Sequence, residues 1–468
     1  MKHKNFLVLL FFSFFVFSCA EDNDVTVPRN LQEYIETTSN NDGEVIACAA
    51  SANGNPNLSY IFYYPQEGAT DIRYYEADSL KIVDEKDFSK YRRKSLSIED
   101  VFGGKLQRFS RTSSEENWCL VTYILDGKLH KSNPIRLKNG SKATSWQDNV
   151  TIEYTTSLEP KFTWINDEVG DNDIYFQVIS EVEDDNFLSG TYTKENSFQY
   201  YDTSNVDPNL IINTETPPTL EIDKEYKFTL MDVSADNWVN LVIEENFVPG
   251  NLQEYLEKQT VDNSTEIISF AASENGNDNL SYIYYYPLTN ARDFRYYETV
   301  DVNADKDDFS NYRRKYLTDE TAFGVKLRRF SRSDDEDSWC IVTYEIDGKV
   351  YKSKPIHLQN KSNPTTYKTD ENVDDSQTLK PKFTWEDFGT TNNTQYFLAL
   401  TDSENTFMSG VFTKEITFQY YNISNTTSNI NTETPPDLIL EDNYNVTIFG
   451  LSDDNWVNLS IKYTFEAK

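Results

Sequence analysis

Two short stretches of the sequence carry a positive charge that contrasts with the rest of the chain. Residues 90–111 read KYRRKSLSIEDVFGGKLQRFSR, and residues 311–332 repeat the pattern as NYRRKYLTDETAFGVKLRRFSR. Each stretch, called here the first or second basic island, holds seven basic and two acidic side chains, whereas the whole chain has a net charge of −34. Guanidinium groups suit carboxylates and sulfates, because their planar fork donates two parallel hydrogen bonds.

The islands predict a site for an anionic ligand, such as a sulfated or uronate-rich polysaccharide. The residues expected to bind it are Arg92, Arg93, Arg108, Arg111, Arg313, Arg314, Arg329 and Arg332. The alternative is that these side chains pair with the protein's own Asp and Glu, which is the commoner fate of surface charges. The acidity of the whole chain argues against nucleic acid as a partner, since phosphate binding needs a dominant basic face.

Strands must hold these arginines in place. Residues 91–96 and 102–111 are expected to be the two arms of a hairpin or of a strand–loop–strand unit. Neighbouring side chains in a strand point to opposite faces, so only one of Arg92 and Arg93 can share a surface with Lys94.

Other catalytic or metal-binding patterns are weak. His130 and His357 are not shared by the two halves of the chain, and no nucleophile motif or phosphate-binding glycine loop is present. The acidic residues are too numerous to single out the carboxylate pair that a glycan hydrolase needs. The acidic clusters at residues 181–185 and 334–337 lack the spacing of a Ca²⁺-binding loop. The sequence therefore predicts no catalytic residue, no metal site and no cofactor.

The chain contains an internal duplication. NLQEY at residues 30–34 returns at 251–255, PKFTW at 160–164 returns at 381–385, and DNWVNL at 236–241 returns at 454–459. This period is far longer than a solenoid repeat, so whole domains have been duplicated. Polar, turn-rich seams at residues 138–144 and 359–366 divide each copy in two, as linkers do.

The expected fold class is all-β. Short runs rich in aromatic and β-branched residues alternate with turns, and Asp126-Gly127 predicts a tight hairpin. The strand, the Asp-Gly turn and the following KSNPI at residues 131–135 resemble the last hairpin of a fibronectin type III or immunoglobulin-like module. We therefore expect a unit of two β-sandwiches that is duplicated in tandem, which gives four modules in all. They are residues 30–138, 145–248, 249–360 (a copy of the first) and 367–468 (a copy of the second).

The immunoglobulin-like resemblance implies one candidate disulfide, between Cys48 in an early strand and Cys119 in the penultimate strand. An oxidising compartment would permit it. The alternative is two buried thiols, because the second copy has Phe270 in place of Cys48 and keeps only Cys340.

The first residues predict export and lipidation. Lys2 and Lys4 precede an apolar run at residues 6–17 that is too short to span a bilayer. Residues 16–19, VFSC, resemble a bacterial lipobox, which makes residues 1–18 a signal peptide and Cys19 the lipidated N-terminus. The acidic tether that follows, residues 19–29, resembles the surface-export signal of Bacteroidetes lipoproteins. The alternative is a secreted protein that is cleaved nearby.

These features predict a non-catalytic binding or adhesion lipoprotein, anchored in the outer membrane by its lipid and facing outward. The expected partner is an extracellular glycan or protein. The alternatives are a carboxylate-dependent glycan hydrolase and a passive envelope spacer.

Overall fold

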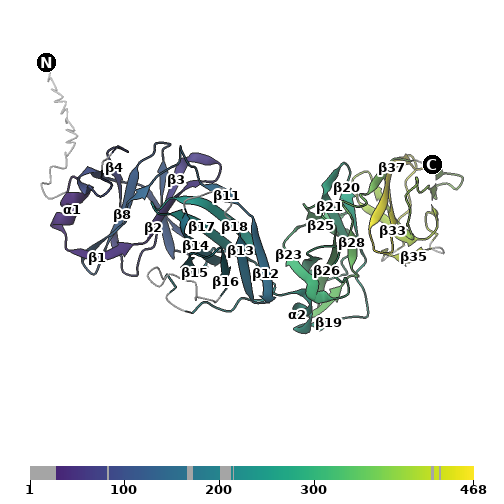
Figure 1. The fold of residues 1–468 in the computed structure, drawn as a ribbon. Helices are drawn as coiled ribbons and strands as arrows, with labels where there is room; N and C mark the ends of the chain where they lie inside the picture. Colours follow the sequence, from purple (N-terminus) through teal and green to yellow (C-terminus); the bar gives the residue numbers. More distant parts are fainter. Residues whose placement is uncertain are drawn as a thin grey trace, which may run out of the picture. The chain divides into compact units, whose positions relative to one another are not determined.

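The computed structural model describes residues 28–81, 84–165, 172–200, 212–213, 216–370, 372–422, 426–431 and 434–468. The described residues form two compact units. The first is drawn from Met1–Ser145, Asp171–Asp173 and Asp232–Leu241, and the second from Trp146–Gly170, Ile174–Met231 and Val242–Lys468. The predicted fold class is confirmed, because the chain is nearly all β and its sheets form four sandwich-like modules (Figure 1). Within the described ranges, no helix is both long and apolar enough to cross a bilayer.

The first module packs two sheets face to face. One has the strand order β1-β9-β8-β4-β5, with β10 beside β8, and the other has the order β2-β3-β7-β6. The strands are β1 (Asn40–Val45), β2 (Ala47–Ala52), β3 (Asn55–Tyr63), β4 (Thr70–Ala77), β5 (Tyr91–Lys94), β6 (Ser97–Val101), β7 (Leu106–Thr112), β8 (Trp118–Leu125), β9 (Lys128–Ser132) and β10 (Ile135–Arg136). Ile61 and Phe109 from one sheet pack with Val121 from the other in a buried core.

One local prediction for this module is confirmed. Asp126 and Gly127 connect β8 to β9 with positive φ angles of 51° and 72°, as a two-residue hairpin turn requires. The helix α1 (Leu31–Thr37) begins after Asn30, whose side chain accepts a hydrogen bond from the Glu33 backbone. The helix covers the outer face of the sheet that contains β8.

The third module repeats this arrangement. Its sheets have the orders β19-β27-β26-β22-β23, with β28 beside β26, and β20-β21-β25-β24. The elements are α2 (Leu252–Glu257), β19 (Thr260–Val261), β20 (Ser269–Glu274), β21 (Asn277–Tyr285), β22 (Arg292–Thr299), β23 (Tyr312–Lys315), β24 (Thr318–Ala322), β25 (Leu327–Arg332), β26 (Ser338–Ile346), β27 (Lys349–Lys352) and β28 (Ile356–Leu358). Short 3-10 turns, η1 (Phe88–Lys90) and η2 (Phe309–Asn311), precede β5 and β23.

The second module has a five-stranded sheet, β11-β18-β17-β14-β15, and a three-stranded sheet, β12-β13-β16. Its strands are β11 (Ser145–Gln147), β12 (Val150–Thr156), β13 (Glu159–Trp164), β14 (Asn172–Glu181), β15 (Phe187–Thr193), β16 (Ser197–Gln199), β17 (Tyr226–Ser234) and β18 (Val239–Phe247). The stacked rings of Phe162 and Phe228, with centroids 4.3 Å apart, join the two sheets.

The fourth module has the orders β29-β37-β36-β32-β33-β35 and β30-β31-β34. Its strands are β29 (Thr366–Lys368), β30 (Val373–Asp374), β31 (Lys382–Thr384), β32 (Gln395–Asp402), β33 (Phe407–Thr413), β34 (Thr417–Gln419), β35 (Thr426–Asn429), β36 (Asn443–Leu451) and β37 (Val457–Glu466). Phe383 and Trp385 pack with Leu398 in its core.

The seams within each copy are packed. Thr144 is 8% exposed and exchanges hydrogen bonds with Ser51, and Thr365 does the same with Ser273. Trp238, from the turn between β17 and β18, lies in the core of the first module and is fully buried. Trp456 is its counterpart in the core of the third module. Side-chain hydrogen bonds therefore fix each seam to the module that precedes it, and a tryptophan inserts into the core of that module.

Candidate anion-binding groove

The structure divides each basic island between the two sheets of its module. In the first island β5 pairs with β4, whereas β6 and β7 pair with each other in the opposite sheet. The prediction that residues 91–96 and 102–111 are the two arms of one unit is therefore wrong, because the chain changes sheets after β5. The hairpin is β6–β7, and the arginines of one island do not share one surface.

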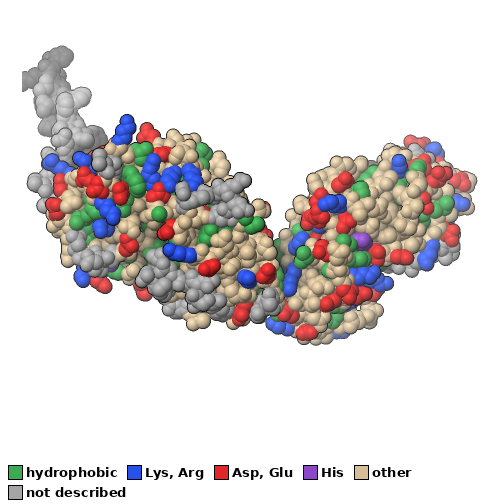
Figure 2. Space-filling model, viewed as in Figure 1, with side chains coloured by type: hydrophobic (Ala, Val, Ile, Leu, Met, Phe, Trp, Pro, Cys, Tyr) green, Lys and Arg blue, Asp and Glu red, His purple; other side chains and the backbone are tan. Residues whose placement is uncertain are grey.

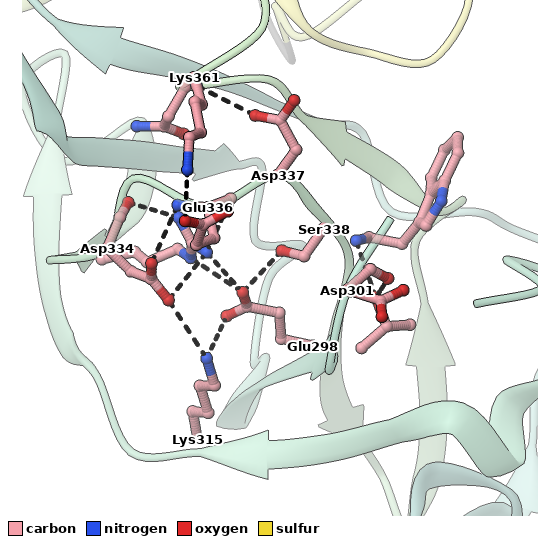
Figure 3. Close-up of polar contacts among 12 residues, drawn as sticks. Glu298, Asp301, Lys315, Asp334, Glu336, Asp337, Ser338 and Lys361 are labelled. Carbon is pink, nitrogen blue, oxygen red and sulfur yellow. Dashed lines mark hydrogen bonds and ion pairs between the residues drawn. The ribbon is translucent and has the colours of Figure 1, made fainter. Parts of the chain in front are cut away.

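One arginine of each island is buried. Arg332 is 2% exposed, and its Nε and Nη2 donate to Oε1 of Glu298 at 3.0 and 2.7 Å. Lys315 Nζ lies 3.0 Å from the same carboxylate (Figure 3). Burial raises the pKa of Glu298, but the charges of Lys315 and Arg332 outweigh it and lower the pKa to about 2. Arg111 pairs with Glu76 in the same way, so these arginines are structural.

The acidic cluster at residues 334–337 belongs to the same network. Asp334 lies 3.1 Å from Arg332 Nη2, and Glu336 lies 2.5 Å from Lys361 Nζ (Figure 3). Among the described residues, no group of three or more His, Cys, Asp or Glu side chains is placed to hold a metal ion. The acids of this loop instead neutralise cations of their own module.

Most of the other arginines are paired within the protein. Figure 2 shows Lys and Arg side chains beside Asp and Glu over much of the visible face. Their contacts are Arg92 with Asp78 (3.0 Å), Arg108 with Glu99 (2.7 Å), Arg313 with the Gly250 carbonyl and the Tyr154 ring, Arg314 with the Asp223 carbonyl (2.8 Å), and Arg329 with Glu320 (2.9 Å). Arg93 is exposed and makes no hydrogen bond or ion pair with another described residue.

Arg329 lies in a groove between the third and fourth modules, both of which belong to the second compact unit. The groove has a volume of about 570 Å³. β25 contributes Arg329 to one wall, and β37 contributes Lys462 to the other. The remaining polar lining consists of hydroxyl and amide side chains: Tyr284, Thr321, Thr401, Asn405, Asn445, Thr447, Tyr463 and Thr464.

The two cations of the groove differ in how they are neutralised. The Arg329 guanidinium pairs with Glu320 and stacks on the Tyr282 ring, 3.9 Å from its centroid. Lys462 has no ion pair with another described residue, and its ammonium lies 5.9 Å from the Phe449 centroid. Burial lowers the pKa of Lys462, and the charge of Arg329 lowers it further. A carboxylate or sulfate placed between the two cations would relieve this repulsion.

The comparisons with known proteins identify no family. No family model matches the chain, and no curated protein matches it. Among solved structures, the FN1–FN3 domains of chicken CNTN1 are 11% identical with a TM-score of 0.18, covering 69% of this chain and 99% of that one. A tetra-tandem repeat from the extending region of a large adhesion protein is 10% identical with a TM-score of 0.16, covering 91% and 99%. Both TM-scores are low, so the fold assignment rests on the sheets described above.

Sequence reasoning missed Lys462, because it lies outside both islands. When the two DNWVNL motifs are aligned, Lys462 of the second copy corresponds to Glu244 of the first. This reversal of charge is the signal in the sequence that distinguishes the groove of the second copy.

The structure does not bring Cys48 and Cys119 together. Both are buried free thiols. Cys119 lies in the core of the first module with Ala49, whereas Cys48 precedes Ala49 in β2 and faces the opposite side of that sheet. Burial raises the pKa of Cys48 to about 12, which disfavours the reactive thiolate. The proposed lipid attachment at Cys19 lies outside the described residues.

Proposed function

We propose that this chain is a non-catalytic binding protein, displayed on the outer face of an outer membrane through lipidated Cys19, that captures an anionic glycan. One observation supports the class of ligand: Lys462 lies beside Arg329 in the groove and has no ion pair with a carboxylate of the described residues.

The electrostatic argument favours an anion in this groove. A like charge and partial burial both disfavour the ammonium form of Lys462. A bound anion would offset the repulsion from Arg329 and would compensate the buried charge of Lys462 by pairing with it. A charge-assisted hydrogen bond contributes about 1.5–3 kcal/mol, which corresponds to roughly a tenfold to hundredfold change in affinity.

The rest of the lining favours a sugar over a simple inorganic ion. Threonine hydroxyls and asparagine amides both donate and accept hydrogen bonds, as sugar hydroxyls require. The open groove, bounded by strands of two modules, offers these groups along its length. A sulfated or uronate-rich polysaccharide supplies both the anion and the hydroxyls.

Retention of the purified chain on immobilised polysaccharides tests this function. We expect binding to a sulfated or uronate-rich polysaccharide and none to a neutral one, with binding weakened as salt rises. The double variant Arg329→Gln/Lys462→Gln should lose at least tenfold in affinity. Binding should also weaken at high pH, once Lys462 loses its proton.

The first copy provides the matched control. In the first copy, Arg108 corresponds to Arg329 and Glu244 corresponds to Lys462, so Arg108→Gln should leave binding unchanged. Equal retention of the double variant would contradict the groove. Release of shortened products would favour a glycan hydrolase, and no retention of the wild type at low salt would favour a passive spacer.

A further inference from the structure

A loop of the second module is bound by cationic and phenolic side chains of the third module. Asp223, in residues 221–224, is 5% exposed, and its carboxylate accepts hydrogen bonds from Arg295 Nη1 at 2.7 Å and Tyr297 Oη at 2.5 Å. Its backbone carbonyl accepts from Arg314 Nη1 and Tyr316 Oη, both at 2.8 Å. Both modules lie in the second compact unit. Their contact shows, within one chain, how a loop of this kind is bound.

An apolar contact accompanies these hydrogen bonds. Ile222, beside Asp223, packs against the buried cluster of Leu252, Tyr255 and Tyr297. The contact therefore combines a buried carboxylate with an aliphatic side chain on an aromatic surface, the usual anatomy of a small specific interface.

The fourth module carries the same loop in the same conformation. Residues 439–442 correspond to 221–224, and Glu441 has a φ of 68° where Asp223 has 64°. The Tyr444 hydroxyl accepts from the Ile439 backbone at 2.9 Å, as Tyr226 does from Glu221 at 3.0 Å. Here, however, Ile439 is 62% exposed and Leu440, the counterpart of Ile222, is 56% exposed. We call residues 439–442 the distal loop.

The first module carries the matching recognition groups. Arg73 lies over the Tyr34 ring at 3.9 Å and pairs with Asp71 at 2.7 Å. Arg295 lies over Tyr255 at 4.2 Å and pairs with Asp293 at 2.7 Å. Tyr75 and Arg93 stand where Tyr297 and Arg314 stand in the third module, and the exposed Arg93 has no ion pair with a described residue.

We propose that the distal loop of one chain docks onto the first module of a second copy, with Glu441 at Arg73 and Arg93 and Leu440 beside Tyr34. The contact is head to tail, so it joins different surfaces of the two partners and allows chains to add in sequence. This inference goes beyond glycan binding and does not depend on it.

The first module matches the third module closely but incompletely at this site, and this difference sets the expected strength of the association between chains. Ser95 takes the place of Tyr316, and Tyr75 is buried with its hydroxyl accepting from Arg73 Nη1, so two of the four hydrogen bonds have no free counterpart. The covalent connection between the second and third modules is also absent between separate chains, which removes the high effective concentration that a linker provides. We therefore expect weak association that depends on protein concentration.

Sedimentation of the full chain without its lipid anchor tests the proposal, over concentrations up to about 1 mM. The wild type should form dimers and larger species. Arg93→Glu, which blocks the first module, and Leu440→Asp, which blocks the distal loop, should each be monomeric. An equimolar mixture of these two variants should form a dimer and nothing larger, because each retains one intact surface.

Two measurements keep the result interpretable. Arg93 and Leu440 are exposed, so both variants should retain the far-UV circular dichroism and urea midpoint of the wild type. Ile165→Asp changes a 70% exposed side chain elsewhere and should leave the association unchanged. A wild type that stays monomeric, or a mixture that stays monomeric while the wild type associates, overturns the proposal.

Discussion

Asp232 is a buried carboxylate that accepts no hydrogen bond from the described residues. Its side chain is fully buried, and neither carboxylate oxygen has a hydrogen-bond partner among those residues. Burial raises the pKa of Asp232 from 3.8 to about 7, while the charge of Lys142 acts in the opposite direction. In the second copy Gly450 takes this position, and a Cβ there would lie 2.8 Å from the Asn393 side chain. The two copies therefore fill the same site differently.

The titration of Asp232 predicts a pH-dependent stability. Because its pKa is higher in the folded state, its contribution to stability is full below pH 4 and is lost as the pH rises through about 7. Asp232→Asn should therefore raise the free energy of unfolding relative to the wild type more at pH 8 than at pH 5, by up to about 3 kcal/mol. Urea unfolding at both pH values measures the difference. Asp184→Asn, at an exposed carboxylate, should show no such difference, and parallel pH profiles for Asp232→Asn and the wild type would contradict the assignment.

At the scale of elements, the turn between β24 and β25 joins the third module to the fourth. Phe323, Gly324 and Val325 have successive positive φ angles of 49°, 58° and 66°. The Phe323 ring contacts Phe397 and Phe449 of the fourth module. A Cβ on Gly324 would lie 2.5 Å from the Asn405 carbonyl oxygen and 2.7 Å from the Phe407 nitrogen. Only glycine fits this approach between two backbones.

Gly324→Ala should destabilise this junction. The substitution introduces a backbone clash as well as the cost of a positive φ, and overpacking of this kind typically costs about 1–3 kcal/mol. Gly276→Ala is the control, because Gly276 has a φ of 75° but no atom within 4 Å of the added Cβ. Thermal unfolding of both variants measures the difference in stability. An equal loss of stability in the two variants would show that the close contact at Gly324 adds no cost of its own.

At the scale of the whole molecule, the two copies share a fold but differ on their surfaces. Phe270 takes the place of Cys48, and its ring centroid lies 5.2 Å from that of Phe397 and 5.6 Å from that of Phe449. One buried cluster therefore joins the third and fourth modules. Lys462 in place of Glu244 gives the groove beside this cluster its second cation. We infer that the proposed anion-binding groove belongs to the second copy.

We propose that display of the whole chain at the cell surface depends on lipidation of Cys19. Two or more acyl chains anchor a protein firmly, whereas one chain does so marginally. The Cys19→Ala variant should therefore be absent from the membrane fraction and carry no labelled fatty acid. The wild type should stay in the membrane fraction and carry the label. Protease added to intact cells should trim the wild type. Retained label in the variant would contradict lipidation at Cys19, and a protected wild-type chain would contradict outward display.

The sequence by itself determined the all-β class, the duplication and the Asp126-Gly127 hairpin, because these features depend on local backbone preferences and periodicity. It also predicted basic islands, but it placed their arginines in one unit. Only the tertiary structure decided that Arg111 and Arg332 are buried against Glu76 and Glu298, and that Lys462 faces Arg329. The physical reason is that charge pairing and burial depend on which strands become neighbours. Residues that are tens of positions apart, or more than a hundred apart as Arg329 and Lys462 are, meet only when the sheets pack.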